Sequence, residues 1–183
     1  MQNFTELARR RRSIRKFTPE KLTEDQVVEL MKAALFAPSS KGSRPWEFVL
    51  VDDPVLLHEL SECKPAGAEL VAGAPLAVVV AADTTRTEAW VEDASVAATM
   101  LLLQAEDMGL GACWVQVNGR TQDDGTPSAD IVRDILNLPA ECAPLAIVAV
   151  GHKAAERKPQ NDEKLLWEKI HLNGYRHEDK GVR

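Results

Sequence analysis

The decisive stretch of this 183-residue chain is Arg11-Arg12-Ser13-Ile14-Arg15-Lys16-Phe17. Six basic residues fall within the eight positions 9–16, although the whole chain has a formal net charge of -6. Such a density of cations on an acidic protein indicates an anionic partner. Arginine presents a planar fork of donors that matches phosphate, and a phosphate held by Arg11, Arg12 and Arg15 with the Ser13 hydroxyl is one reading. A solvated helix end and a nucleic-acid-binding arm are the alternatives.

The composition indicates one soluble domain over residues 1–183, with 45% apolar and 27% charged residues. No apolar run approaches the roughly 20 residues of a membrane-spanning helix, so no membrane partner is expected. Three cysteines without CxxC spacing indicate a reducing cytoplasm. No Cys or His pair has the spacing of a metal site, and the acidic net charge argues against a nucleic-acid partner.

Hydrophobic periodicity predicts helices and strands that alternate irregularly along the chain. Thr23 and Gln26 form a capping-box pattern at the start of one helix, and Ser128 is expected to cap another. The apolar run from Leu76 to Ala82 predicts a strand buried on both faces. Helices are expected over residues 3–12, 24–37, 54–63, 88–108 and 128–136, and strands over residues 46–51, 76–82, 112–117 and 145–150.

Two further stretches have residue types that suit a ligand. Residues 37–46 read Ala-Pro-Ser-Ser-Lys-Gly-Ser-Arg-Pro-Trp, a loop of small hydroxyl residues that is equally well read as a polar connection. Trp46 itself is expected in the core. Residues 108–114 read Met-Gly-Leu-Gly-Ala-Cys-Trp, which lacks the third glycine and the following helix of a dinucleotide-binding fingerprint. Gly109 is expected to end a helix.

Taken together and in this order, these motifs resemble those of the nitroreductase-like FMN-dependent oxidoreductases. The resemblance extends over roughly residues 5–175 and rests most strongly on residues 11–17, then on residues 38–46 and 109–114. It implies an α+β, nitroreductase-like fold, with a central mixed sheet of about four to five strands flanked by helices. It also implies an intertwined homodimer in which residues 154–183 form a tail that docks on the other subunit.

The resemblance further implies non-covalent FMN, with the chemistry on flavin N5 and no catalytic side chain. Arg11, Arg12 and Ser13 would then hold the FMN phosphate, and Arg15 would reach the pyrimidine end of the ring. Residues of the other subunit would flank the ring, and Gly111 would offer a backbone contact. A basic residue after the last strand, either Lys153 or Lys158, would complete the phosphate site. The residues expected from the other subunit are Pro38, Ser39 and Ser40.

Arg44 departs from the family pattern, because an amide residue often precedes the Pro-Trp pair. It is expected near the flavin or its phosphate, where a second cation would alter substrate preference, or it points to solvent.

The implied activity is a ping-pong, two-electron transfer from NADH or NADPH to a small-molecule acceptor such as a nitroaromatic, quinone or enone. The sequence shows no motif that chooses between the two nicotinamides. Two alternatives remain open: an FMN storage or sensor protein without NAD(P)H turnover, and an interaction protein that uses residues 9–16 on a polyanion.

Overall fold

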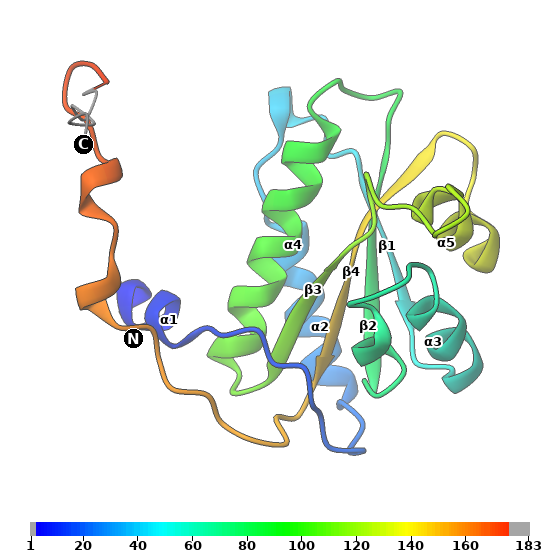
Figure 1. Ribbon diagram of the computed structural model, residues 1–183, viewed down its shortest axis with the longest axis horizontal. Coiled ribbons are helices and arrows are strands. Elements are labelled where there is room, and N and C mark those ends of the chain that lie inside the picture. Colours follow the sequence, from blue (N-terminus) through cyan, green and yellow to red (C-terminus); the bar gives the residue numbers. More distant parts are fainter. Residues whose placement is uncertain (1–2, 176–183) are drawn as a thin grey trace, which may run out of the picture.

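The computed structural model of this chain describes residues 3–175 and has an α+β fold built on one four-stranded sheet (Figure 1). The sheet order is β1-β2-β4-β3. Its strands are β1 (Trp46–Val51), β2 (Leu76–Asp83), β3 (Gly111–Gln116) and β4 (Cys142–Gly151). The α-helices are α1 (Phe4–Arg10), α2 (Glu24–Leu35), α3 (Pro54–Ser61), α4 (Trp90–Asp107) and α5 (Ser128–Leu136).

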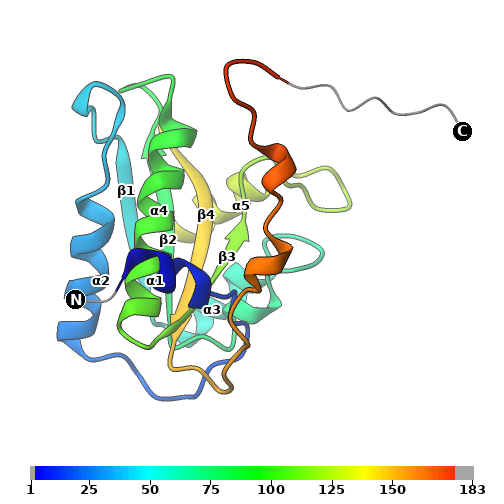
Figure 2. The same cartoon turned by 90° about the vertical axis from the view of Figure 1, so that its left-hand side faces the viewer.

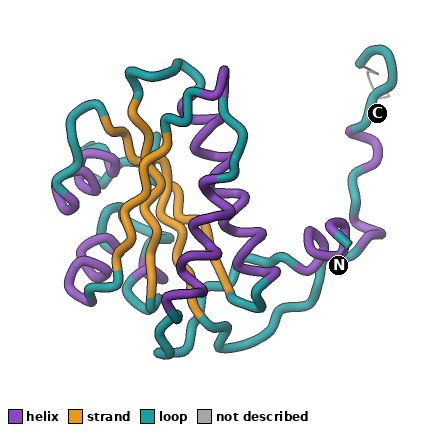
Figure 3. Tube along the Cα trace, turned by 180° about the vertical axis from the view of Figure 1, so that it is seen from behind, coloured by secondary structure: helices purple, strands orange, loops and turns teal. Residues whose placement is uncertain are grey.

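Strand β2 is buried on both faces, as its continuous apolar run predicts. Alternate side chains of a strand point to opposite faces, so Val78 and Val80 pack beneath α2 and α4, whereas Ala77 and Val79 pack against α3 and α5. Figure 3 shows these two helical layers on either side of the sheet. The core is therefore divided into two clusters by the sheet itself.

The expectation of a mixed sheet is wrong for the named strands. Each neighbouring pair, β1 with β2, β2 with β4 and β3 with β4, is antiparallel. Among the described residues, parallel pairing is limited to one isolated bridge between Ser13 and Ala112. An apolar run reports that both faces of a strand are covered, and it carries no information on strand direction.

The capping chemistry agrees with the sequence at α2 and disagrees at α5. The Thr23 hydroxyl accepts the Gln26 N–H at 3.2 Å, and the Gln26 side chain accepts the Thr23 N–H at 2.9 Å, which completes the predicted capping box. Ser128 is not the N-cap of α5: Pro127 has that position, and Ser128 is the first helical residue, fully buried. The preceding Pro127 supplies the extended backbone that the cap position requires.

Residues after β4 leave the core and run along the N-terminal segment before standing away from the molecule (Figures 1 and 2). The Gln160 N–H donates to the Arg9 carbonyl at 2.9 Å, and Arg9 forms an ion pair with Asp162 at 3.2 Å. Beyond this contact, large apolar side chains are exposed along the tail, namely Leu165, Leu166, Trp167, Ile170, Leu172 and Tyr175. The last eight residues of the predicted tail lie outside the described residues.

Within residues 3–175, no helix combines the length and the apolar composition needed to cross a bilayer.

We predict that Gly151→Ala lowers the free energy of unfolding by about 1–3 kcal/mol, because overpacking a filled core costs that much. A Cβ at Gly151 would lie 2.6 Å from Cδ and 2.7 Å from Cγ of the rigid Pro75 ring. Gly73→Ala is the matched control, since its nearest atom, the Leu70 carbonyl oxygen, is 3.9 Å away. Urea unfolding measures both, and equal stabilities of the two variants would contradict the packing described here.

Candidate functional site

The basic segment, residues 11–17, is fixed between the start of β3 and the chain that follows β4. The Ile14 N–H donates to the Ala112 carbonyl at 3.0 Å. On the other side, the Thr18 N–H donates to His152 at 2.9 Å, and the Ala154 N–H donates to Lys16 at 3.1 Å. The segment therefore extends one end of the sheet, and hydrogen bonds fix the position of the backbone that carries its cations.

The basic segment lies so close to the start of β3 that only glycine fits at position 111. A Cβ built at Gly111 would lie 2.7 Å from Cγ2 and 2.8 Å from Cβ of Ile14. The buried side chain of Ile14 thus occupies the space that a side chain at position 111 would need. The predicted backbone contact of Gly111 with a ligand remains a prediction.

A hollow of about 350 Å³ opens beside the basic segment, and we call it the basic hollow. Its volume lies in the range of small-molecule sites, roughly 300–1,000 Å³. Its charged lining comprises three cations and one carboxylate, an excess of positive charge that suits an anionic ligand. The lining residues are Ser13, Ile14, Arg15, Lys16, Ala155, Glu156 and Arg157.

Lys153, one of the two expected phosphate ligands, already has carboxylate partners. Its ammonium lies 3.2 Å from Glu106 and 3.3 Å from Glu156. The Lys153 and Glu106 side chains are only 9% and 8% exposed, so this is a buried ion pair. It joins the end of α4 to the chain after β4, and it keeps that chain against the basic segment.

Lys158, the other expected ligand, is exposed and lies along the basic segment. Its backbone carbonyl accepts a hydrogen bond from the Arg12 guanidinium. Arg157, which was not among the expected site residues, lines the basic hollow directly. The local sequence Ala-Ala-Glu-Arg-Lys-Pro offers two adjacent cations, and only the register of the chain after β4 decides which one faces the hollow.

The Cys113 thiol lies beneath the basic segment, next to the Ser13 hydroxyl. Burial raises its pKa, while the nearby Arg15 guanidinium and a hydrogen bond with Ser13 act in the opposite direction. Burial likewise raises the pKa of Cys63 and of Cys142. All three cysteines are free and buried, and they remain protonated thiols at neutral pH.

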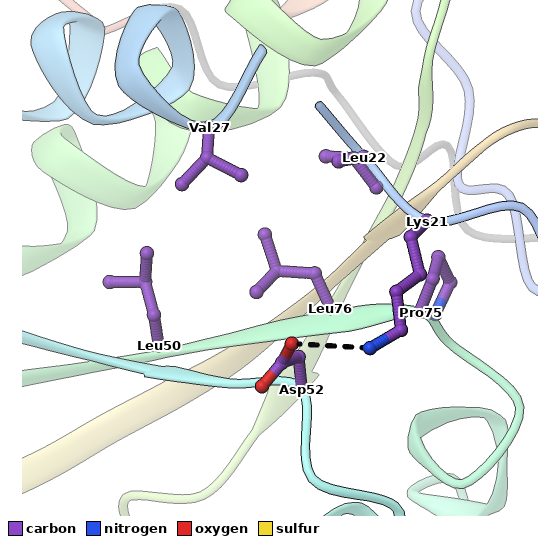
Figure 4. A pocket seen from close by; sticks show the side chains of 7 residues that line it. All are labelled: Lys21, Leu22, Val27, Leu50, Asp52, Pro75 and Leu76. Carbon is purple, nitrogen blue, oxygen red and sulfur yellow. Dashed lines mark ion pairs between the residues drawn. The ribbon is translucent and has the colours of Figure 1, made fainter. Parts of the chain in front are cut away.

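A second hollow, of about 190 Å³, lies between the start of α2 and strands β1 and β2 (Figure 4). Its lining is mostly apolar, with Leu22, Val27 and Leu50 among its residues. Its two charged groups, Lys21 and Asp52, form an ion pair at 3.5 Å and neutralise each other. This hollow therefore lacks the excess positive charge of the basic hollow.

The loop of residues 38–45 is held by Asp93, in the first turn of α4. The buried Asp93 carboxylate accepts the Ser40 N–H at 2.8 Å and the Ser43 hydroxyl at 3.3 Å. Charge-assisted hydrogen bonds of this kind are about twice as strong as neutral ones. Asp93 lies 53 positions after Ser40 in the sequence, and no local signal pairs the two residues.

The basic segment and residues 38–45 lie at opposite ends of the sheet. The basic segment pairs near Gly111 and Gly151, whereas the loop precedes Trp46, which pairs with Ala82. The separation also follows from α4, because Asp93 binds the loop and Glu106 binds Lys153. Thirteen helical residues at 1.5 Å each place these anchors about 20 Å apart.

The chain thus brings together some of the predicted site residues and keeps the others apart. One group gathers at the basic hollow and along the segment beside it. The loop residues form a separate group within the same chain. The first group is Arg11, Arg12, Ser13, Arg15, Gly111, Lys153 and Lys158, and the second is Pro38, Ser39, Ser40 and Arg44.

Comparison with known proteins gives consistent matches over most of the chain. A family model described as the nitroreductase family matches residues 8–63 and 55–152. A protein of Methanothermobacter thermautotrophicus, provisionally named NADH dehydrogenase/NAD(P)H nitroreductase, is 30% identical over 170 residues, with 91% of this chain and 85% of the relative covered.

Solved structures agree with the sequence comparison. An FMN-dependent nitroreductase from Clostridium difficile superposes with a TM-score of 0.90 at 40% identity, covering 92% of this chain and 98% of the other. An NADPH:FMN oxidoreductase from Vibrio harveyi, complexed with NAD+, superposes with a TM-score of 0.81 at 28% identity, covering 97% and 80%.

We predict that Glu106→Gln lowers the free energy of unfolding by up to about 3 kcal/mol, because the buried Lys153 ammonium loses its buried partner and keeps only the exposed Glu156 carboxylate. The double variant Glu106→Leu/Lys153→Met removes both charges and should recover most of that loss. Urea unfolding of the two variants measures the difference. A double variant less stable than the single one would show that the pair is not buried as described.

The three thiols should resist 5,5′-dithiobis(2-nitrobenzoate) in the native protein at pH 8 and should react fully in denaturant. Burial raises the pKa values of the three thiols above those of the unfolded chain. Their contribution to the free energy of unfolding is therefore fully present at neutral pH. It falls as the pH rises above about 8.5, where unfolded thiols ionise first. Rapid native labelling of Cys113 would contradict this environment.

Proposed function

This chain belongs to the nitroreductase family, and on that premise we propose that it is an FMN-dependent NAD(P)H oxidoreductase that reduces a small electrophile. The names of its relatives support the activity class, since they include an FMN-dependent nitroreductase and an NADPH:FMN oxidoreductase. The observation that carries the proposal for this chain is the basic hollow. Three cations and a serine hydroxyl surround a space of about 350 Å³ on an otherwise acidic protein.

The residues of the basic hollow fit a flavin mononucleotide. In our proposal, Ser13 of the hollow holds its phosphate together with Arg11 and Arg12, which precede it in the basic segment, and Arg15 meets the pyrimidine end of the ring. Arg157 joins the phosphate site, since its side chain lines the hollow while Lys153 is bound to two carboxylates. When bound, FMN supplies the two-electron carrier that accepts hydride from NADH or NADPH.

The protein's own contribution is to bind and orient. Arg15 supplies a positive charge beside the ring, which favours its reduced, anionic form and so tunes its potential. Because the donor must leave before the acceptor enters the same space, we expect ping-pong kinetics. Nitroaromatics, quinones and enones are the acceptors that we propose.

We propose that the site is completed by a second copy of the chain. Within one chain, Ser39 and Ser40 lie about 20 Å from the basic hollow, measured along α4. A two-fold dimer brings unlike ends of two copies together, and then Pro38, Ser39 and Ser40 of one copy flank the flavin of the other.

The exposed apolar side chains support the same assembly. Trp167 and Ile170 are each 68% exposed, a costly arrangement unless another surface covers them. A further hollow, lined by Phe4, Leu7, Ala33, Met100 and Leu103, lies between α1, α2 and α4. We propose that residues 1–183 form one FMN-binding domain, whose tail after residue 154 docks on the partner subunit.

The absorbance spectrum of the purified protein tests the proposed function. We expect the visible absorbance bands of an oxidised flavin, release of FMN on denaturation, and bleaching under anaerobic titration with NADH or NADPH. A protein that is colourless, and stays so after incubation with FMN, would contradict the proposal. A yellow protein that neither nicotinamide reduces would instead indicate storage or sensing of FMN.

We predict that Arg157→Gln raises the dissociation constant for FMN about tenfold or more, because one charge-assisted hydrogen bond to phosphate is lost. Arg9→Gln is the matched control. It also removes one arginine charge, but Arg9 does not line the basic hollow and is already paired with Glu6 and Asp162. Fluorescence titration of the two apoproteins measures the difference, and equal affinities would remove Arg157 from the site.

A further inference from the structure

Arg44 is displayed from a loop whose backbone is fixed on all sides. Asp93 holds the loop at Ser40 and Ser43. The Arg44 N–H donates to the Ser39 hydroxyl at 2.9 Å, and the Arg44 carbonyl accepts from the Arg86 guanidinium at 3.1 Å. Both backbone polar groups of Arg44 are therefore engaged, and the position of its Cα is set by the surrounding chain.

This fixed backbone is also strained. Arg44 has φ 47° and Lys41 has φ 51°, so two non-glycine residues of one short loop adopt the left-handed region. Such a conformation is unfavourable for an L-amino acid, because its Cβ lies too close to the following carbonyl oxygen. Strain of this kind persists where surrounding structure imposes it, and it concentrates at functional sites. Both strained residues are exposed cations.

The Arg44 guanidinium has no partner within residues 3–175: no ion pair or side-chain hydrogen bond joins it to another described group. Asp83, a neighbouring carboxylate, is already engaged. Hydrogen bonds from Thr85 lower the pKa of Asp83, and Arg86 lies 3.8 Å from it. The loop thus presents a free planar fork of donors, the geometry that matches carboxylate or phosphate.

We propose that Arg44 determines specificity by binding an anionic group of the substrate, so that this protein prefers a carboxylate- or phosphate-bearing substrate over its neutral counterpart. The inference rests on the proposed function, in which this loop faces the flavin of a second copy. Two sources of the anion are compatible with one guanidinium: the 2′-phosphate of NADPH, and a carboxylate on the electron acceptor.

The two half-reactions distinguish these sources. Stopped-flow reduction of the holoprotein gives the rate ratio for NADPH over NADH, and reoxidation gives the ratio for 4-nitrobenzoate over the neutral 4-nitrobenzamide. We expect Arg44→Gln to lower one of the two ratios about tenfold or more, the effect of losing one charge-assisted hydrogen bond. The half-reaction that changes identifies the anion. Arg44→Lys should retain part of the preference, because it keeps the charge without the fork.

Lys32→Gln is the matched control, since it removes one exposed positive charge from α2, where Lys32 is paired with Glu29. Both ratios should stay at wild-type values in this variant. The inference is overturned if Arg44→Gln changes neither ratio by more than about twofold, or if it weakens FMN binding and leaves both ratios intact.

Failure of the proposed function gives a different result. The wild-type protein would then hold no FMN, or neither nicotinamide would reduce it. Arg44 is still tested in that case, because equilibrium titration with 4-nitrobenzoate, 4-nitrobenzamide, NADP+ and NAD+ needs no turnover. Loss of the preference for the charged ligand in Arg44→Gln supports the inference, and equal binding of charged and neutral ligands by the wild type overturns it.

Discussion

Strand β4 is the constraint on which the rest of the molecule depends. It is hydrogen-bonded to β2 along one edge and to β3 along the other. Because α4 lies along the same sheet, the two groups of ligand-type residues are kept at opposite ends, about 20 Å apart. A single copy therefore presents two separated surfaces, and in our proposal a second copy brings its loop of residues 38–45 to the basic hollow of the first.

The cations near the basic segment and the basic hollow fall into two classes according to whether a carboxylate neutralises them. The Lys153 ammonium is buried against Glu106, where desolvation is offset by two carboxylates, so it secures the chain after β4. Arg15 and Arg157 line an open hollow whose lining contains one carboxylate, Glu156. Their charge is available to a ligand. A protein with a net charge of -6 can therefore recognise an anion locally without attracting polyanions along its whole surface.

In the loop of residues 38–45, a buried carboxylate holds the backbone and the cations are exposed. Its backbone is organised by one buried carboxylate, Asp93, which comes from a helix that begins about 50 positions later in the chain. Its exposed face carries Lys41 and Arg44 in strained conformations. Backbone strain and unpaired charge thus coincide on a rigid support, which is the combination expected of a recognition surface.

Local patterns predicted those parts of the fold that depend on neighbouring residues. The Thr23–Gln26 capping box, the buried run of β2 and the αL glycine at Gly109 are each set within a few positions, and the structure has all three. Trp46 is in the core, as predicted. Gly111 was expected to approach a ligand, and the structure shows that it admits Ile14, from a segment almost 100 positions earlier.

What the sequence could not predict depends on distant contacts. The direction of the strands follows from how the connections cross the sheet, so the expected mixed sheet was wrong. Ser128 has the residue type of a cap, yet Pro127 takes the extended position before α5. The register of the chain after β4 decides whether Lys153, Arg157 or Lys158 meets the basic hollow, and that register is set by pairing with residues 9–18.

Complementation between two defective variants tests the shared site most directly. Arg15→Gln/Arg157→Gln damages the basic hollow, and Ser40→Trp obstructs the loop. In a mixed dimer, the unaltered hollow of one chain meets the unaltered loop of the other. Refolding the two variants together should therefore restore about one quarter of the wild-type FMN content, because half of random dimers are mixed and each has one intact site. A mixture that binds no more FMN than the separate variants would contradict the account.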